Sequence, residues 1–245
     1  MYREIHIAGR PFGDIDELVA RYCGVPLNGN PPEIWAFPYY DLIEVDGPDR
    51  MSSLDVVASA AMQPRISRED YGYFGDHRIR DAWSSWLREL PEEATLGRRA
   101  SPAVVDHLQG LFEVLHSLES PNGHIPSLSL LTKVLHRRRP HLIPIFDRSV
   151  VDFYRPVTRQ RGESSWPLLV EALDRDLSEV HNYEVLDRIA AEVMDAIGQR
   201  YDRLSALRCL DIAVWMKWNE REEERRSMIS ARGRPPQGYS GGRRS

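Results

Sequence analysis

The sequence predicts an all-α protein, a multi-helix bundle with a cleft between two helical lobes. Two observations predict this class. From Met51 onward, apolar residues recur at helical spacing almost throughout. Serine, aspartate or asparagine stands before most of these segments, where helix N-caps are expected. The chain shows no internal repeat and no strand-rich region.

Composition is ordinary for a globular protein. Of 245 residues, 42% are hydrophobic and 28% are charged, no apolar run approaches the length of a membrane span, and the first residues do not resemble a signal peptide. Cys23 and Cys209 are the only cysteines. They indicate a reducing compartment, so we expect a cytoplasmic protein without disulfides. We expect a monomer, no cofactor, no metal and no membrane partner.

The sequence divides into three parts. Residues 1–50 form an N-terminal arm with a short helix over 14–23, ended by Gly24, and an aromatic segment that could form a hairpin or an extended arm. Residues 51–227 form the helical domain. Residues 228–245 are rich in Gly, Pro, Ser and Arg, which predicts a disordered basic tail.

Each helix of the central part has a recognisable start. Ser101 followed by Pro102 is a strong one, because serine caps the helix and proline fits its first position. Each remaining start is a single polar residue. The expected helices cover about 52–62, 67 onward, 76–90, 101–118, 127–139, 147–154, 164–180, 182–200 and 205–226.

The stretch from Ser127 to Tyr154 organises the rest. Apolar residues at helical spacing form an amphipathic helix that ends in the basic run His136-Arg137-Arg138-Arg139. Pro140 stops the helix, and an apolar connector, 142–146, leads to Asp147, which stands where the cap of the next helix is expected. A carboxylate is therefore placed at a helix start, close to several arginines.

This order of elements resembles the helix-hairpin-helix DNA glycosylase superfamily. There a hairpin grips the DNA backbone, and an aspartate that begins the next helix serves the reaction. The sequence also resembles an uncharacterised bacterial family, of actinobacterial type and unknown function. The shared segments are a K-x-L-x-R-x-R-P-x-L-x-P-x-x-D-x-x-V core, here Lys133 to Val150, and an L-R-x-L-D-x-x-x-W-M segment, here Leu207 to Met216.

The chain departs from the glycosylase pattern at the hairpin. Ile125 and Ser127 occupy the positions of the two glycines, which normally permit close approach to phosphate. Ser129 occupies the position of the lysine nucleophile of bifunctional members. No four-cysteine cluster follows. A reaction through a Schiff base at this position is therefore not expected, and neither is an iron–sulfur cluster.

The resemblance implies a monofunctional DNA N-glycosylase that flips a modified or damaged base out of the duplex, in repair or in antiviral (phage) defence. Asp147 would support the sugar cation and the attack of water. Trp35, Tyr39 and Tyr40 would form the base pocket. The DNA contacts would come from Ser127, Ser129, Lys133, Arg137, Arg138, Arg139, Arg155, Arg159 and Arg161.

Other interpretations of these residues remain open. Asp147 can be an N-cap alone, the three arginines can form a solvated helix end, and we favour packing for the aromatic residues. Asp211 is expected to hydrogen-bond Arg208 or a neighbouring helix. The tetrapeptide 232–235, RGRP, resembles the core of an AT-hook, although a solubilising tail is the simpler interpretation.

Lys133 has two interpretations of its own, a surface residue or a phosphate ligand. We place it on an exposed helix face, which would not supply the desolvation that a lysine nucleophile needs. The sequence therefore predicts base release that leaves the abasic strand intact. The net charge of −5 weighs against DNA binding, although local patches rather than totals decide such contacts. The alternatives to a glycosylase are a non-catalytic helical DNA-binding protein and a protein-interaction scaffold.

Overall fold

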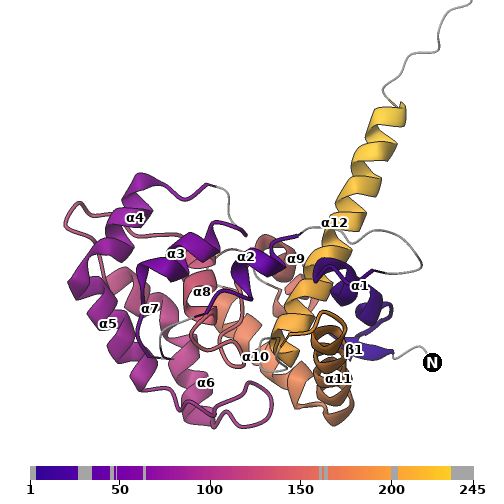
Figure 1. Ribbon diagram of the computed structural model, residues 1–245, viewed down its shortest axis with the longest axis horizontal. Coiled ribbons are helices and arrows are strands. Elements are labelled where there is room, and N and C mark those ends of the chain that lie inside the picture. Colours follow the sequence, from indigo (N-terminus) through magenta and orange to yellow (C-terminus); the bar gives the residue numbers. More distant parts are fainter. Residues whose placement is uncertain are drawn as a thin grey trace, which may run out of the picture.

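The structure is a computed structural model that describes residues 4–26, 35–44, 47, 49–62, 65–159, 162, 165–199 and 204–232. The described chain is mostly helical, which confirms the all-α class (Figure 1). The helices are α1 (Ile15–Tyr22), α2 (Phe37–Tyr40), α3 (Ser53–Ser59), α4 (Arg68–Gly75), α5 (His77–Arg88), α6 (Pro102–Gln109), α7 (Leu111–Ser117), α8 (Leu128–His136), α9 (Arg148–Thr158), α10 (Trp166–Ser178), α11 (Val180–Ala196) and α12 (Ala206–Arg232). Among the described residues, none of the helices is both long and apolar enough to cross a membrane.

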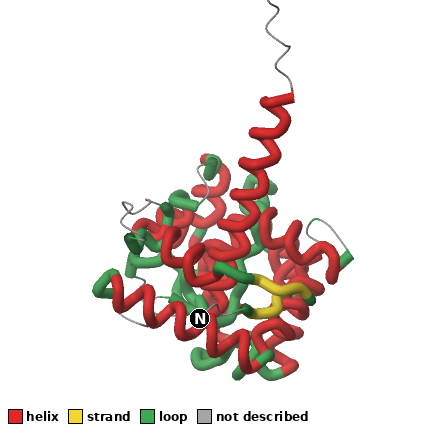
Figure 2. The backbone as a smooth tube through the Cα atoms, turned by 90° about the vertical axis from the view of Figure 1, so that its right-hand side faces the viewer, coloured by secondary structure: helices red, strands yellow, loops and turns green. Residues whose placement is uncertain are grey.

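A small hairpin lies at the N-terminal end of the described chain. Strands β1 (Ile5–Ile7) and β2 (Arg10–Phe12) pair antiparallel, with Ile5 opposite Phe12. Figure 2 shows this pair at one side of an otherwise helical molecule. The hairpin lies upstream of the aromatic segment where we had considered one. That segment instead forms the short helix α2.

Several helix starts confirm the sequence analysis. The Ser101 side chain accepts a hydrogen bond from the Val104 N–H, and α4 has a capping box in which Ser67 and Asp70 bond each other's backbone. The helix expected over 101–118 is divided at Gly110 into α6 and α7. Helix α12 continues to Arg232, beyond the expected start of the tail at 228, and residues 233–245 lie outside the described chain.

The helices fall into two groups in Figure 1, with α3 to α7 on one side and α1, α11 and α12 on the other. Helices α8 and α9 lie between these groups, where α8 contacts α3 and α9 contacts α12. One hydrophobic core runs through both groups. It buries Trp83 on one side and Ile212 on the other. This arrangement places the stretch from α8 to α9 in the middle of the molecule.

Candidate active site

A lysine–aspartate ion pair lies at the start of α9. The Asp147 Oδ2 atom accepts a hydrogen bond from Lys133 Nζ at 3.1 Å, and Oδ1 accepts from the Ser149 N–H and hydroxyl, each at 3.2 Å. Asp147 is the N-cap of α9, as the sequence predicts. Its side chain is 25% exposed, whereas that of Lys133 is 3% exposed. The pair therefore presents a carboxylate to solvent and keeps the ammonium group behind it.

Lys133 reaches this position from α8. Its Nζ atom also donates to Ser129 Oγ at 3.1 Å, one helical turn earlier, and the Tyr40 hydroxyl donates to its backbone carbonyl. The expectation that Lys133 lies on an exposed face is wrong, because the side chain points inward to Asp147. Ser129, expected at DNA, is half-buried and is a partner of this lysine.

The basic run after α8 is buried. Arg137 and Arg138 both contact the carboxylate of Asp55, which is fully buried, and Arg139 pairs with Asp49. Both interpretations from sequence placed these three side chains at the surface, and both are wrong about their location. Burial of a cation requires an anion or several carbonyl groups as partners, and upstream segments supply them. The carbonyl groups of Tyr40, Ile43, Gly47 and Leu87 complete the set.

The other expected DNA contacts lie at separate places. Ser127 is exposed and caps α8, because its Oγ accepts from the Leu130 N–H. Arg155 is half-buried and pairs with Asp152 on the same helix. Arg159 is exposed at the end of α9, in the left-handed conformation with φ of 56°. Arg161 lies outside the described residues.

The three aromatic residues expected around a base have different surroundings. Trp35 packs against Tyr22 and Trp215, with ring centroids 6.4 and 5.2 Å away. Tyr40 is buried against His136 and reaches the backbone of Lys133. Tyr39 is 59% exposed. Trp35 and Tyr40 therefore pack against other side chains of the protein.

A second charged network joins α12 to the same region. Arg208 forms ion pairs with Asp41 and Asp211, donates to the Tyr22 hydroxyl at 3.0 Å, and lies over the ring of Tyr40 at 5.2 Å. The expected hydrogen bond between Arg208 and Asp211 is confirmed. Burial alone would lower the pKa of Arg208, but Asp41, Tyr22 and Asp211 outweigh it and raise that pKa. The guanidinium group is therefore permanently charged.

The two segments 133–150 and 207–216 interact electrostatically, because the pKa of Asp211 responds to the charges of Asp147 and Lys133. Burial raises the pKa of Asp211 and the charge of Asp147 adds to this effect, while Arg208 and Lys133 oppose it, so that the pKa is about 6. Burial likewise lowers the pKa of His136 to about 3, with a contribution from Arg208, so this histidine is neutral. Asp211 is thus a buried carboxyl group that titrates within the field of the Lys133–Asp147 pair.

Sequence reasoning missed two features of the site. Arg148 follows Asp147 directly and its side chain is 82% exposed, with one loose contact to Asp152 at 3.7 Å. Its place in the first turn of α9 was readable, yet it was not selected. Asp41 and Asp55 were missed as partners of arginines because they lie more than 80 residues from them, and no local spacing reports such a contact.

The described side chains contain no group of three or more His, Cys, Asp and Glu residues that could hold a metal ion. The Lys133–Asp147 pair itself offers acid–base and electrostatic chemistry. A partly exposed carboxylate can accept a proton from water and can stabilise a neighbouring positive charge.

The described chain is mostly helical, and the Lys133–Asp147 ion pair lies between its two groups of helices (Figure 1). Residues 16–218 match the model of a family described as a family of unknown function, DUF6308. The chain belongs to that family. No curated protein and no solved structure matches the chain.

Proposed function

We propose that this protein is a monofunctional DNA N-glycosylase with Asp147 as its catalytic carboxylate. The observation that carries the proposal is the Asp147 side chain, 25% exposed at the start of α9 and held by Lys133 and Ser149. Supporting it is the resemblance of the order helix, connector, aspartate and helix to the glycosylase superfamily. We extend the proposal to the fold: α7, the turn over 118–127 and α8 form the helix-hairpin-helix unit.

The proposed reaction hydrolyses the bond between the sugar C1′ and the base nitrogen. The bond breaks with its electron pair going to the base, and positive charge develops on the sugar ring. The Asp147 carboxylate stabilises that cation and accepts a proton from the water that attacks C1′. The proton then passes to the departing base, and the sugar keeps a hydroxyl group at C1′. Lys133 acts here as a positioning residue, because it holds one carboxylate oxygen.

Hydrolysis rather than a covalent route follows from the ion pair. A lysine nucleophile must offer its side-chain nitrogen to the sugar. Lys133 Nζ instead donates hydrogen bonds to Asp147 Oδ2 and Ser129 Oγ, at 3.1 Å each, and its side chain is only 3% exposed. The nitrogen is therefore directed at these two partners rather than at solvent.

The buried arginines change the proposed mode of DNA contact. Arg137, Arg138 and Arg139 have protein partners, so the phosphates would be met by exposed cations of the helix that Asp147 caps instead. Arg148 and Arg159, at the two ends of α9, are the candidates. Such contacts position DNA without reading its sequence.

The test is base release from duplex and single-stranded DNA that carries a panel of modified bases, followed by heat or alkali to cut abasic sites. Asp147→Asn is the decisive variant, because asparagine caps a helix about as well as aspartate but carries no charge. We expect release by the natural chain and none by the variant. Release that Asp147→Asn leaves unchanged would remove Asp147 from the mechanism, and absence of release from the whole panel would remove the enzyme proposal.

A second candidate function is a protein-interaction scaffold, and one observation favours it. Figure 1 shows the C-terminal part of α12 extending away from the body of the molecule. Residues 223–228 of this part are exposed. Pull-down of a partner that depends on this segment, in a chain without DNA binding at low salt, would favour the scaffold.

A further inference from the structure

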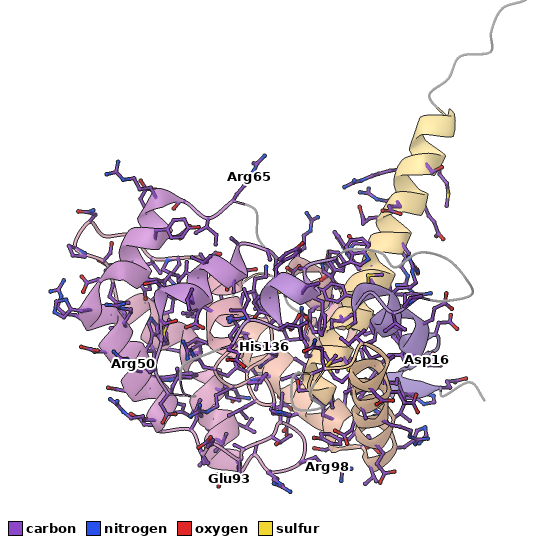
Figure 3. The ribbon with its side chains drawn as sticks, in the orientation of Figure 1. Asp16, Arg50, Arg65, Glu93, Arg98 and His136 are labelled. Atoms are coloured by element: carbon purple, nitrogen blue, oxygen red, sulfur yellow. The ribbon has the colours of Figure 1, made fainter. Side chains whose placement is uncertain are left out.

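A cavity of about 630 Å³ lies away from the Lys133–Asp147 pair, at the edge of the molecule where Figure 3 labels Glu93 and Arg98. It is formed by the loop between α5 and α6, the turn after Pro140, and α11. Its polar lining residues are Glu92, Glu93, Thr95, Arg98, Arg99, His141 and Tyr183. The volume lies within the range of about 300–1,000 Å³ that is typical of small-molecule sites.

The loop that carries the two arginines is tied into a tight turn. The Thr95 carbonyl accepts hydrogen bonds from the N–H groups of Arg98 and Arg99, at 3.1 and 2.9 Å. The Leu96 N–H donates to the His141 carbonyl at 3.0 Å, which fastens this turn to the opposite wall of the cavity. The two guanidinium groups therefore start from a fixed backbone.

Gly97 fixes the turn against α10. Its φ of +79° is a conformation that side chains disfavour, and an added Cβ atom would lie 2.4 Å from the Leu177 backbone. The Gly97 N–H donates to Asp174 Oδ1 at 2.8 Å. The closest approach of loop and helix in this region thus depends on glycine at this position.

Among the described residues, neither arginine has a carboxylate partner, unlike Arg137, Arg138 and Arg208 of the core. The Arg98 guanidinium lies over the ring of Tyr183, 4.6 Å from its centroid, and Arg99 makes no side-chain ion pair or hydrogen bond within the described chain. Glu92 and Glu93 line the same cavity without pairing with either of them. Adjacent like charges repel, so the two cations are set to receive an anion.

The hydrogen-bond donors of the cavity, the Tyr183 hydroxyl and the arginine N–H groups, match the oxygens of a phosphate. Burial raises the pKa of Tyr183, and Asp187 adds to that effect against Arg98 and Arg99, so the phenol remains a hydroxyl donor. Arginine presents paired N–H groups that match the oxygens of a phosphate. A phosphate alone is much smaller than 630 Å³, which leaves room for a body attached to it. Two carboxylates on the rim can accept from hydroxyl or amino groups of that body.

We propose that this cavity is a mononucleotide site, in which Arg98 and Arg99 bind the 5′-phosphate and Glu92 and Glu93 accept from the sugar or the base. Tyr183 holds Arg98 over its ring and so positions one of the two cations. The site shares no residue with the Lys133–Asp147 pair, and the inference does not depend on the glycosylase proposal.

The test is calorimetric titration of the full chain with four probes: AMP, adenosine, ribose 5-phosphate and inorganic phosphate. We expect AMP to bind most tightly and adenosine at least about tenfold more weakly, because a bidentate charge-assisted contact is lost. Arg98→Ala/Arg99→Ala should weaken AMP binding at least about tenfold. The matched control is Arg225→Ala/Arg226→Ala, which removes two neighbouring exposed arginines from the outer part of α12 and should leave AMP binding unchanged.

Each other outcome overturns part or all of the proposal. Equal affinity for AMP and adenosine removes the phosphate from the recognition. Inorganic phosphate bound as tightly as AMP reduces the cavity to an anion site and overturns the mononucleotide assignment. Unchanged AMP affinity in Arg98→Ala/Arg99→Ala places binding elsewhere, and no binding of any probe ends the proposal. Circular dichroism of both double variants separates loss of binding from loss of fold.

Discussion

Helix α8 and the turn after it supply four cations, and the fold uses them in two different ways. Arg137 and Arg138 close completely around the Asp55 carboxylate, which has no exposed surface. Lys133 meets Asp147, whose side chain keeps a quarter of its surface exposed. The first group has no access to a ligand, whereas the second offers an oriented carboxylate to solvent. The comparison shows that location, rather than residue type, separates structural charges from candidate chemical ones.

Removing the buried carboxylate of Asp55 should have the largest effect on stability. Asp55→Ala would leave Arg137 and Arg138 buried without their anion, and loss of one partner of a buried ion pair costs about 3–5 kcal/mol. Urea unfolding measures this change in the free energy of unfolding. Asp152→Ala, which removes a partly exposed partner of Arg155, is the control and should cost about 1 kcal/mol or less. Equal losses in the two variants would contradict the distinction.

Asp147→Asn should give the reverse result, a large chemical effect with a smaller effect on stability than Asp55→Ala, because the amide oxygen of asparagine can still accept the hydrogen bond of Lys133. The loss of a catalytic carboxylate lowers a rate by about 10²- to 10⁴-fold, while the N-cap of α9 is kept. Single-turnover base release and urea unfolding of the same variant check both parts.

The same reaction mixture tests the hydrolytic route. With borohydride present we expect no protein–DNA adduct, because Lys133 Nζ is buried and donates to Asp147 and Ser129. A trapped adduct that Lys133→Ala abolishes would show instead a covalent route through this lysine.

Asp211 sharpens the comparison through pH, because it is buried yet lies within the field of Asp147. Its pKa in the folded chain is about 6, above the ordinary value of 3.8, so the folded state binds the proton more tightly than the unfolded state. Stability should therefore fall as pH rises from about 4 to about 6, by up to about 3 kcal/mol. Asp211→Asn should remove this fall while Asp41 still pairs with Arg208. If the stability of the natural chain and of Asp211→Asn depended on pH in the same way, this prediction would be contradicted.

Arg148→Ala should have the smallest effect. If Arg148 contacts one DNA phosphate, its loss weakens binding uniformly across sequences and reduces the salt slope by about 1. Fluorescence anisotropy at several salt concentrations measures that slope. Arg78→Ala, an exposed arginine at the start of α5, is the control, and a change as large in this variant would show that the contact is not local to α9.

Local signals in the sequence predicted local structure well. The N-cap role of Asp147, the cap of Ser101 and the pairing of Arg208 with Asp211 all depend on neighbours within four residues. Each was predicted from those neighbours. The direction of the Lys133 side chain was predicted wrongly, because it depends on Asp147, fourteen residues later and beyond the connector.

The burial of the three arginines could not be predicted in the same way. A run such as Arg137-Arg138-Arg139 is indistinguishable from a solvated helix end until its partners are known. Those partners, Asp55 and Asp49, come from segments that fold back over 80 to 90 residues. Hydrophobic periodicity reports which face is buried, but it does not report which distant carboxylate will lie on that face.

The Arg208 network has a consequence for how the chain is synthesised. Arg208 enters the core 167 residues after Asp41 and 186 residues after Tyr22, and α1 packs against α12. Contacts between such distant segments are slow to form, because the long intervening chain must first be closed. On the ribosome, α1 and Asp41 emerge long before their partner exists. Until then, Asp41 lacks the positive charge of Arg208. The N-terminal segment therefore reaches its final packing only after α12 has been synthesised.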